Sequence, residues 1–435
     1  MDSLLYYIWL SLRTGAGNEK ASFLLSKFSS PKNIYDATRE ELYDSLGDYA
    51  LVNLLCDKDL SSSERILEYC ERANVGILTP ESNVYPQRLR AIYAKPVVLY
   101  YKGRFPDVDK NVLLALVGTR KCSDKGARMA YKLGAELSSA GAIVVSGLAS
   151  GIDSMCARGA LSVGAHTIAV LGCGIDRVYP YENEKLMRTI EERGTVITEY
   201  APGMPPSGKH FPVRNRIISG LSLGTVVIEA GKFSGALITA EHARNQGRDV
   251  FALPGDVENE NYSGNNLLIK EGAKIARDAK DILSEYESVW NNKIFTEKIN
   301  QNKYYTGDRI EYIEKNPTEN KESKIKTGFF KKRFSQNSEA ENKNRKTESA
   351  ASEKEKKPEE KVCADIKEEI LTSLSGIEKL VYENLSGAFS CDEIAAEILR
   401  KSGENIGVGE IFGALTTLEI DGYCKELPGG IFVRT

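Results

Sequence analysis

Two stretches decide the fold of this chain: residues 113–120 read LLALVGTR, and residues 142–153 read AIVVSGLASGID. Each begins with a short apolar run, as in strands buried on both faces, and continues into a glycine-containing turn. A helical pattern over Lys125–Ser139 separates the two runs. A strand, a helix and a second strand in this order indicate a right-handed βαβ unit, so the sequence predicts parallel strands.

The same alternation continues along the chain. Further strand-like runs are His166–Leu171, Thr195–Glu199, Val226–Glu229 and Asp249–Leu253. Helical patterns lie between them, among them Glu184–Glu192 and Leu237–Asn245. Six strands alternating with helices predict an α/β fold, a Rossmann-like doubly wound parallel sheet, over residues 110–286.

The flanking segments predict four further parts. Residues 1–65 have apolar spacings typical of short helices, with Leu4, Leu5, Ile8 and Leu12 on one face, and residues 66–109 read as a helix followed by short strands. Residues 287–366 are rich in Lys, Arg, Asp, Glu, Asn and Ser, which predicts a flexible linker. Residues 367–435 contain three helical patterns and a closing hairpin, the order of a winged helix-turn-helix.

Composition excludes several classes of protein. The chain has 435 residues, of which 41% are hydrophobic, and a net charge of −3, so it is neither wholly disordered nor a strongly basic, histone-like protein. No apolar run approaches the roughly 18 residues of a membrane span. Eight cysteines without a CxxC pair and three histidines argue against a zinc or disulfide framework. A reduced cytoplasmic location is expected.

The candidate site lies in the loops that follow the predicted strands, because doubly wound sheets bind ligands beyond the carboxyl ends of their strands. Glycines there let backbone N–H groups approach a phosphate, and Arg120 and Lys209 supply cations. Phe211 beside further arginines suits single-stranded nucleic acid. The candidate residues are Gly118, Arg120, Ser146, Gly147, Gly151, Gly174, Lys209, Phe211, Arg214 and Arg216.

Other chemistries are less well supported. The run Ser146–Gly151 is not GxGxxG, and no acid ends the second strand to hold a ribose, so no nicotinamide cofactor is expected. Glu229 ends a strand and is either a catalytic carboxylate or the partner of an arginine such as Arg216. The histidines His166, His210 and His242 form no triad pattern, and no metal-ligand cluster stands out.

The predicted third C-terminal helix, Val408–Asp421, carries three acids and neither Lys nor Arg. A duplex-reading helix would be basic, so protein interaction or a structural role is favoured for residues 367–435. The aromatic and basic run Gly328–Phe334 within the linker is either a solvated cluster or a weak contact for nucleic acid or a partner.

Several motifs resemble the DNA processing protein DprA family, also called Smf. They are Ser146–Asp153, Phe211–Ile218 with Gly220–Ser222, Thr239-Ala240 with Gly247–Gly255, and Gly264–Ala273. The N-terminal helices resemble the sterile-alpha-motif-like domain of many members, and the C-terminal unit resembles their winged-helix domain.

The resemblance implies a non-enzymatic protein that binds and protects incoming single-stranded DNA without sequence preference. It also implies a homodimer that loads the RecA recombinase in natural transformation. The family's DNA-contacting residues fall on Arg120, Lys209 and Phe211. The alternative is a related nucleotide N-glycosidic hydrolase. Residues Gly224-Thr225 through Glu229, together with Arg216, faintly match the pattern of that family.

Overall fold

The computed structural model describes residues 2–301, 374, 376–385, 389–403, 406–420, 423–427 and 431–434. These residues belong to one compact unit. The predicted linker beyond residue 301, the run Gly328–Phe334, Asp421 and the hairpin turn Pro428–Gly430 lie outside the described residues. Within the described part, no helix is both long and apolar enough to cross a membrane.

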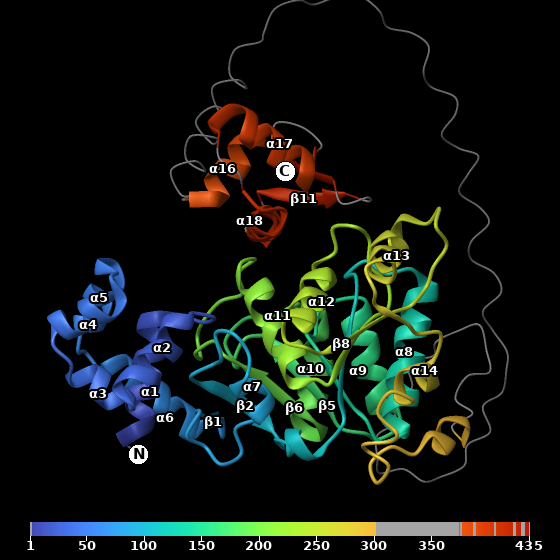
Figure 1. Cartoon of the computed structure of the whole chain (residues 1–435), viewed down its shortest axis with the longest axis horizontal. Coiled ribbons are helices and arrows are strands. Elements are labelled where there is room, and N and C mark those ends of the chain that lie inside the picture. Colours follow the sequence, from blue (N-terminus) through green and yellow to red (C-terminus); the bar gives the residue numbers. More distant parts are fainter. Residues whose placement is uncertain are drawn as a thin grey trace, which may run out of the picture. The chain divides into compact units, whose positions relative to one another are not determined.

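The central domain is built on a nine-stranded sheet, enclosed by helices in Figure 1, with the order β1-β2-β6-β5-β4-β3-β7-β8-β9. The six central strands are parallel, and β9 adds in parallel beside β8, whereas β2 runs antiparallel to both β1 and β6. The bounds are β1 Gly76–Leu78, β2 Leu99–Gly103, β3 Leu113–Val117, β4 Ile143–Ser146, β5 Thr167–Leu171, β6 Thr195–Thr198, β7 Gly224–Val227, β8 Asp249–Ala252 and β9 Lys274–Ile275. The predicted parallel α/β sheet is confirmed, and the segment predicted only to connect, residues 66–109, contributes two of its strands.

Helices cover the sheet in two groups. Their bounds are α7 Gln87–Arg90, α8 Asp124–Ser139, α9 Ile152–Ser162, α10 Glu184–Arg193, α11 His210–Leu221, α12 Gly235–Asn245, α13 Ser263–Lys270 and α14 Ala279–Leu283. Helix α8 packs on α9, and α11 packs on α12. Glycine permits the first contact, because a Cβ on Gly134 would lie 2.2 Å from the carbonyl oxygen of Cys156.

The strand order contains a topological switch point. The chain moves outward from β3 through β4 and β5 to β6, then returns through α11 to β7 on the other side of β3. The right-handed crossovers therefore place α11 and α12 on the face opposite α8 and α9. The loops after β3 and β7 diverge at this point, where open α/β sheets bind their ligands.

Two hydrophobic cores flank the sheet. In β5, Ile168 and Val170 belong to the core under α11 and α12, whereas Ala169 and Leu171 belong to the core on the other face. Successive residues of a strand point to opposite faces, so a continuous apolar run fills both cores. This explains why the strand signals in the sequence are unbroken apolar runs.

Six helices precede the sheet: α1 Asp2–Thr14, α2 Glu19–Phe28, α3 Pro31–Asp36, α4 Arg39–Leu46, α5 Tyr49–Cys56 and α6 Ser61–Arg72. The predicted apolar face of α1 is only partly correct. Ile8 is fully buried but Leu4, Leu5 and Leu12 are half-buried. Trp9 lies in the core of the helical bundle and Tyr7 in the core of the central domain, so α1 packs on both sides. The predicted boundary at residue 65 falls inside α6.

The predicted linker starts too early. Ile294 and Ile299 are buried, and the backbone N–H of Phe295 donates to the carbonyl of Ala140, 2.9 Å away. A short 3-10 helix, η4, spans Thr296–Gln301 and contacts α8. Residues 287–301 are therefore part of the central domain.

The C-terminal elements are α16 Gly376–Asn384, β10 Phe389–Ser390, α17 Cys391–Ser402, α18 Val408–Ile420, β11 Cys424–Leu427 and β12 Ile431–Arg434. The strands form an antiparallel sheet in the order β10-β12-β11. Ser390 and Glu393 form a capping box at the start of α17. We call residues 376–434 the C-terminal module.

Candidate nucleic-acid interface

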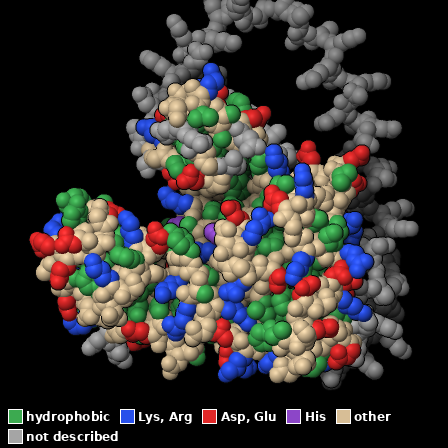
Figure 2. Space-filling view, in the orientation of Figure 1, with side chains coloured by type: hydrophobic (Ala, Val, Ile, Leu, Met, Phe, Trp, Pro, Cys, Tyr) green, Lys and Arg blue, Asp and Glu red, His purple; other side chains and the backbone are tan. Residues whose placement is uncertain are grey.

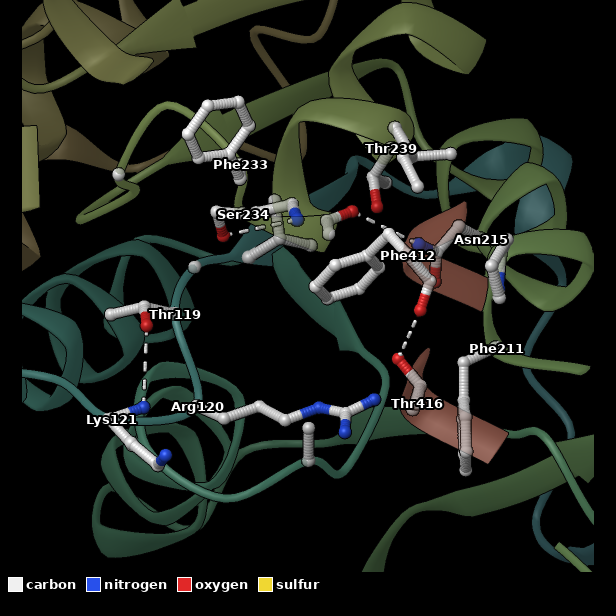
Figure 3. Close-up of a pocket in the computed structure, with 18 of the residues that line it drawn as sticks. Thr119, Arg120, Lys121, Phe211, Asn215, Phe233, Ser234, Thr239, Phe412 and Thr416 are labelled. Atoms are coloured by element: carbon white, nitrogen blue, oxygen red, sulfur yellow. Dashed lines mark hydrogen bonds between the residues drawn. The ribbon is translucent and has the colours of Figure 1, made fainter. Parts of the chain in front are cut away.

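A cavity of about 620 Å³ lies at the switch point between β3 and β7. Its walls in the central domain are the loop Gly118–Lys121 after β3, the loop Gly231–Gly235 after β7, and residues of α11 and α12 (Figure 3). Phe412, Thr416 and Glu419 of α18 line the same cavity. The location agrees with the prediction that the loops after the strands converge on one edge of the sheet.

Glu229 holds the loop that follows β3. Its Oε1 accepts a hydrogen bond from the backbone N–H of Ser123 at 2.8 Å, and its Oε2 accepts one from the Ser123 hydroxyl at 2.6 Å. Its carbonyl oxygen accepts from the backbone N–H of Thr119 at 2.7 Å. Ser123 is the N-cap of α8. The expected pairing of Glu229 with Arg216 is wrong, because this fully buried carboxylate is occupied by Ser123.

Arg120 is exposed and extends across the cavity toward Phe211 (Figure 3). Its guanidinium carbon lies 5.1 Å from the centroid of the Phe211 ring. Tyr179 stacks on the same ring with a centroid separation of 5.2 Å, and Phe211 is only 8% exposed. The prediction that Phe211 offers a free stacking face is therefore corrected: its ring supports Arg120 through a cation–π contact.

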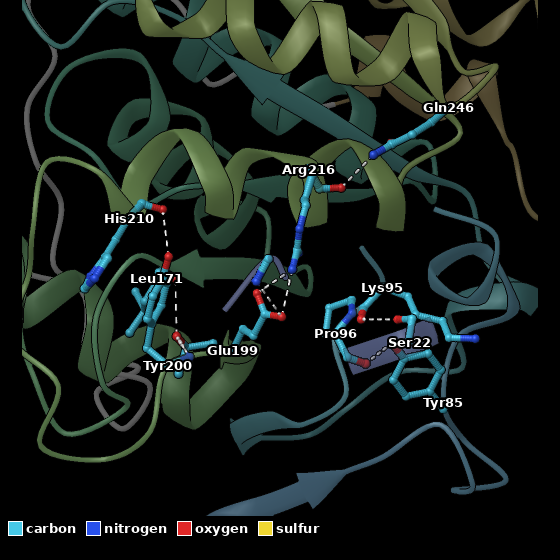
Figure 4. Close-up of polar contacts among 12 residues, drawn as sticks. Ser22, Tyr85, Lys95, Pro96, Leu171, Glu199, Tyr200, His210, Arg216 and Gln246 are labelled. Carbon is cyan, nitrogen blue, oxygen red and sulfur yellow. Dashed lines mark hydrogen bonds and ion pairs between the residues drawn. The ribbon is translucent and has the colours of Figure 1, made fainter. Parts of the chain in front are cut away.

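Arg214 and Arg216 are buried rather than exposed beside the cavity. Arg214 donates through Nη1 to the carbonyl oxygens of Gly147, at 2.8 Å, and Val170. Arg216 donates through Nη2 to both carboxylate oxygens of Glu199, at 2.6 and 2.7 Å (Figure 4). The expectation that both arginines stand ready for a ligand is corrected, because protein groups occupy them.

The loop Ser146–Asp153 is anchored from inside. Asp153 accepts a hydrogen bond from the backbone N–H of Gly147 at 2.9 Å, and Arg214 donates to the carbonyl oxygen of Gly147. Burial raises the pKa of Asp153 to about 6, while the Arg214 guanidinium lowers it. Burial also lowers the pKa of Arg214, to about 10. Ser146 is fully buried, so it belongs to this anchor rather than to an exposed surface.

Two glycines of the predicted site require their lack of a side chain. A Cβ on Gly147 would lie 2.5 Å from Nη2 of Arg214. Gly151 has a φ of +72°, and a Cβ there would lie 2.4 Å from the carbonyl oxygen of Arg120. Gly151 thus lets the loop after β4 support the backbone of Arg120. Gly174, by contrast, packs against Ala201 and does not line the cavity.

Lys209 precedes α11, and its side chain is 68% exposed. Its Nζ lies 3.1 Å from Oε1 of Glu378 in the C-terminal module. The adjacent Gly208 lines the cavity. Two further exposed cations that sequence reasoning missed, Lys121 and Lys232, also line it. We call Arg120, Lys121, Lys209 and Lys232 the switch-point rim.

Asn265 is a second omission from the predicted site. It is fully buried, and its Oδ1 accepts from the backbone N–H of Ala230 at 2.7 Å, while its Nδ2 donates to the carbonyl oxygens of Val227 and Leu253. It therefore sets the course of the loop after β7. The available signal was the position of Asn265 within Gly264–Ala273, one of the motifs that carry the family resemblance.

The exposed cations of the switch-point rim are suited to an anionic ligand. No group of three or more metal-ligating side chains occurs among the described residues. On the face shown in Figure 2, basic and acidic side chains are interspersed. The attraction for a polyanion thus depends on the local geometry of the switch-point rim.

Comparison with known proteins identifies relatives of this chain. Residues 76–287 match the family model described as DNA recombination-mediator protein A. The chain is 45% identical to the DNA processing protein DprA of Streptococcus pneumoniae over 203 residues, which are 47% of this chain and 71% of that protein. It is 34% identical to the protein Smf of Synechocystis over 289 residues, or 65% and 73% of the two chains.

A solved structure shows the same architecture. The X-ray structure of DprA from Streptococcus pneumoniae superposes with a TM-score of 0.58 and 35% sequence identity, covering 65% of this chain and 98% of that chain.

Proposed function

The chain belongs to the DNA recombination-mediator protein A family, and from this premise we propose that it binds single-stranded DNA at the switch-point rim during DNA processing in recombination. The observation that carries the proposal is the exposure of Arg120 and Lys209 beside glycine loops at the switch point. Exposed cations attract phosphates, and glycine loops let backbone N–H groups approach them.

The proposal is for binding rather than catalysis. The hydrolase alternative needs Glu229 and Arg216 at a ligand. Glu229 is fully buried and accepts a hydrogen bond from Ser123, and Arg216 is buried and paired with Glu199. Those two residues act as scaffold in this proposal, which therefore assigns the chain no hydrolytic role.

The family resemblance supports the wider role. We propose that the chain protects incoming DNA, transfers it to the RecA recombinase in natural transformation, and works as a homodimer in the cytoplasm. We further propose that helices α1 to α6 are a sterile-alpha-motif-like domain and that the C-terminal module is a winged helix. Its three helices and antiparallel sheet support the latter assignment.

Binding of labelled oligonucleotides to the full chain tests the proposal. Single-stranded oligo-dT is compared with a duplex of equal length at two salt concentrations. The double variant Arg120→Glu/Lys209→Glu should nearly abolish single-strand binding, because it places two negative charges on the rim. Its unfolding midpoint should stay near the parent's, since both side chains are exposed.

A matched control makes the same change of charge elsewhere. Lys185 and Lys280 are exposed and do not line the cavity, so Lys185→Glu/Lys280→Glu should retain most of the binding. Equal losses in both double variants would show a nonspecific charge effect. A rim variant that folds and binds DNA like the parent would show that the site is placed wrongly.

A further inference from the structure

The C-terminal module contacts the same rim that the proposed function assigns to DNA. Glu378 of α16 accepts from Lys209 at 3.1 Å, and its side chain is only 15% exposed although Lys209 itself is 68% exposed. Three residues of α18, Phe412, Thr416 and Glu419, line the cavity together with Arg120 (Figure 3). A carboxylate thus stands where a phosphate would approach Lys209.

Helix α18 touches the central domain at two places on the border of the cavity. Gly208 is buried, and a Cβ on it would lie 2.1 Å from the backbone nitrogen of Thr417 and 2.6 Å from the carbonyl oxygen of Gly413. On the far wall, a Cβ on Gly235 would lie 3.5 Å from the Phe412 ring. Helix α18 packs directly against backbone at the cavity, so a DNA strand cannot pass between them while this contact holds.

The charge of α18 opposes DNA as well. Between Val408 and Ile420 the helix carries Glu410 and Glu419 and no Lys or Arg. Burial raises the pKa of the Tyr179 phenol, Arg120 lowers it and Glu419 raises it, so Tyr179 lies in the field of both charged side chains. A strand bound along the rim would bring its phosphates next to Glu419, which lines the cavity and repels them.

We propose that the C-terminal module is an intramolecular occupant of the switch-point rim that competes with single-stranded DNA. When it is docked, Glu378 satisfies Lys209 and α18 covers the cavity beside Arg120. DNA gains the rim only when the module leaves it. The proposal rests on the proposed function, because it assumes that the rim is the DNA site.

The competition has a definite consequence for affinity. The apparent dissociation constant of a ligand rises by the inverse of the fraction of molecules whose site is open. Any change that weakens docking without touching the rim should therefore tighten DNA binding. An exposed ion pair contributes modestly, so loss of the Glu378 contact should raise the affinity by up to about fivefold.

The test uses the full chain with two docking variants and one control. Glu378→Gln removes the ion pair without adding a cation. Gly208→Ala adds a methyl group against Thr417 without any change of charge. Glu383→Gln alters an exposed carboxylate on the same helix, α16, that does not line the cavity. Oligo-dT affinity should rise in the first two variants and stay unchanged in the third.

Hydrogen exchange reports docking independently of affinity. In the two docking variants, amides of Gly208 and of residues 412–417 should exchange faster without DNA. Saturating oligo-dT added to the parent should speed exchange in 412–417 and slow it in the loop Gly118–Lys121. Slower exchange of 412–417 with DNA, or weaker binding by both docking variants, would show that the module clamps DNA and would overturn the proposal.

Failure of DNA binding at the rim and failure of the competition give different results. If the parent does not bind oligo-dT, the proposed function fails and competition fails with it, although faster exchange in Glu378→Gln would still identify the docked module. If the parent binds and neither docking variant differs from it, the DNA site stands and only the competition is wrong.

Discussion

The cations of the segment Lys209–Arg216 fall into two environments. Lys209, at the loop end, has a side chain that is 68% exposed, whereas the Arg216 side chain, inside α11, is 6% exposed. Arg120, from the loop after β3, is exposed like Lys209, and Arg214 is buried like Arg216. Residue type alone therefore does not distinguish these cations: the exposed ones lie at the surface beside the cavity, and the buried ones hold the scaffold that presents them.

The largest expected effect concerns the buried side of this comparison. Arg216→Met should destabilise the chain by about 3–5 kcal/mol, because it leaves the buried carboxylate of Glu199 without its cation. Denaturant unfolding measures the change. Arg177→Met, at an exposed arginine of the same domain, should cost less than about 0.5 kcal/mol.

A double variant sharpens this result. Arg216→Met/Glu199→Met replaces the pair by apolar side chains, so it should recover most of the lost stability. If the double variant is as unstable as the single one, the loss comes from packing in α11 and the buried pair has no special role.

The second effect is a pH dependence of stability. The pKa of Asp153 is about 6 in the folded chain and about 3.9 in an unfolded chain, so the folded state binds this proton more tightly. Stability of the parent relative to Asp153→Asn should therefore rise as the pH falls from about 7 to about 4, by up to ~3 kcal/mol. Unfolding at each pH measures this difference. If the relative stability decreased as the pH was lowered, the effect of Arg214 on the pKa of Asp153 would outweigh the effect of burial.

The third effect belongs to the exposed side. Arg120→Ala/Lys209→Ala should lower the slope of log affinity for single-stranded DNA against log salt by about 1.4, since each lost phosphate contact removes roughly 0.7. Affinity should fall about tenfold or more at low salt. The free energy of unfolding should stay within about 0.5 kcal/mol of the parent's. An unchanged slope with lower affinity would mean that these side chains do not contact phosphates.

The smallest expected effect concerns Phe211, whose ring contacts both the exposed Arg120 and the buried Arg214. Phe211→Leu should weaken DNA binding only by about twofold to threefold, because the ring supports Arg120 and is covered by Tyr179. Stacking on a base is worth about 1–3 kcal/mol. A tenfold or greater loss of DNA affinity would therefore show that the Phe211 ring stacks directly on a base. Fluorescence titration with oligo-dT distinguishes the two results.

Local patterns predicted most of the central sheet. The six predicted strands match β3 to β8 with bounds that differ by at most two residues. Strands β1 and β2 were harder to place in the sheet, because β2 pairs antiparallel with β6, a strand much later in the chain, and β1 joins the sheet only through β2. Asn265 was missed for a similar reason: its partners are backbone groups of Val227, Ala230 and Leu253, which lie 12 or more residues away in sequence.

The sequence by itself determined the parallel α/β sheet and the edge of the sheet at which the cavity lies. Apolar runs, helical periods and glycine turns are local properties, and the carboxyl ends of parallel strands share one edge. Only the tertiary structure decided that Arg120 and Lys209 are exposed while Arg214 and Arg216 are buried, that Glu229 holds Ser123, and that Glu378 lies on Lys209. Burial and pairing depend on which distant surfaces pack together, and the spacing of residues along one segment does not contain that information.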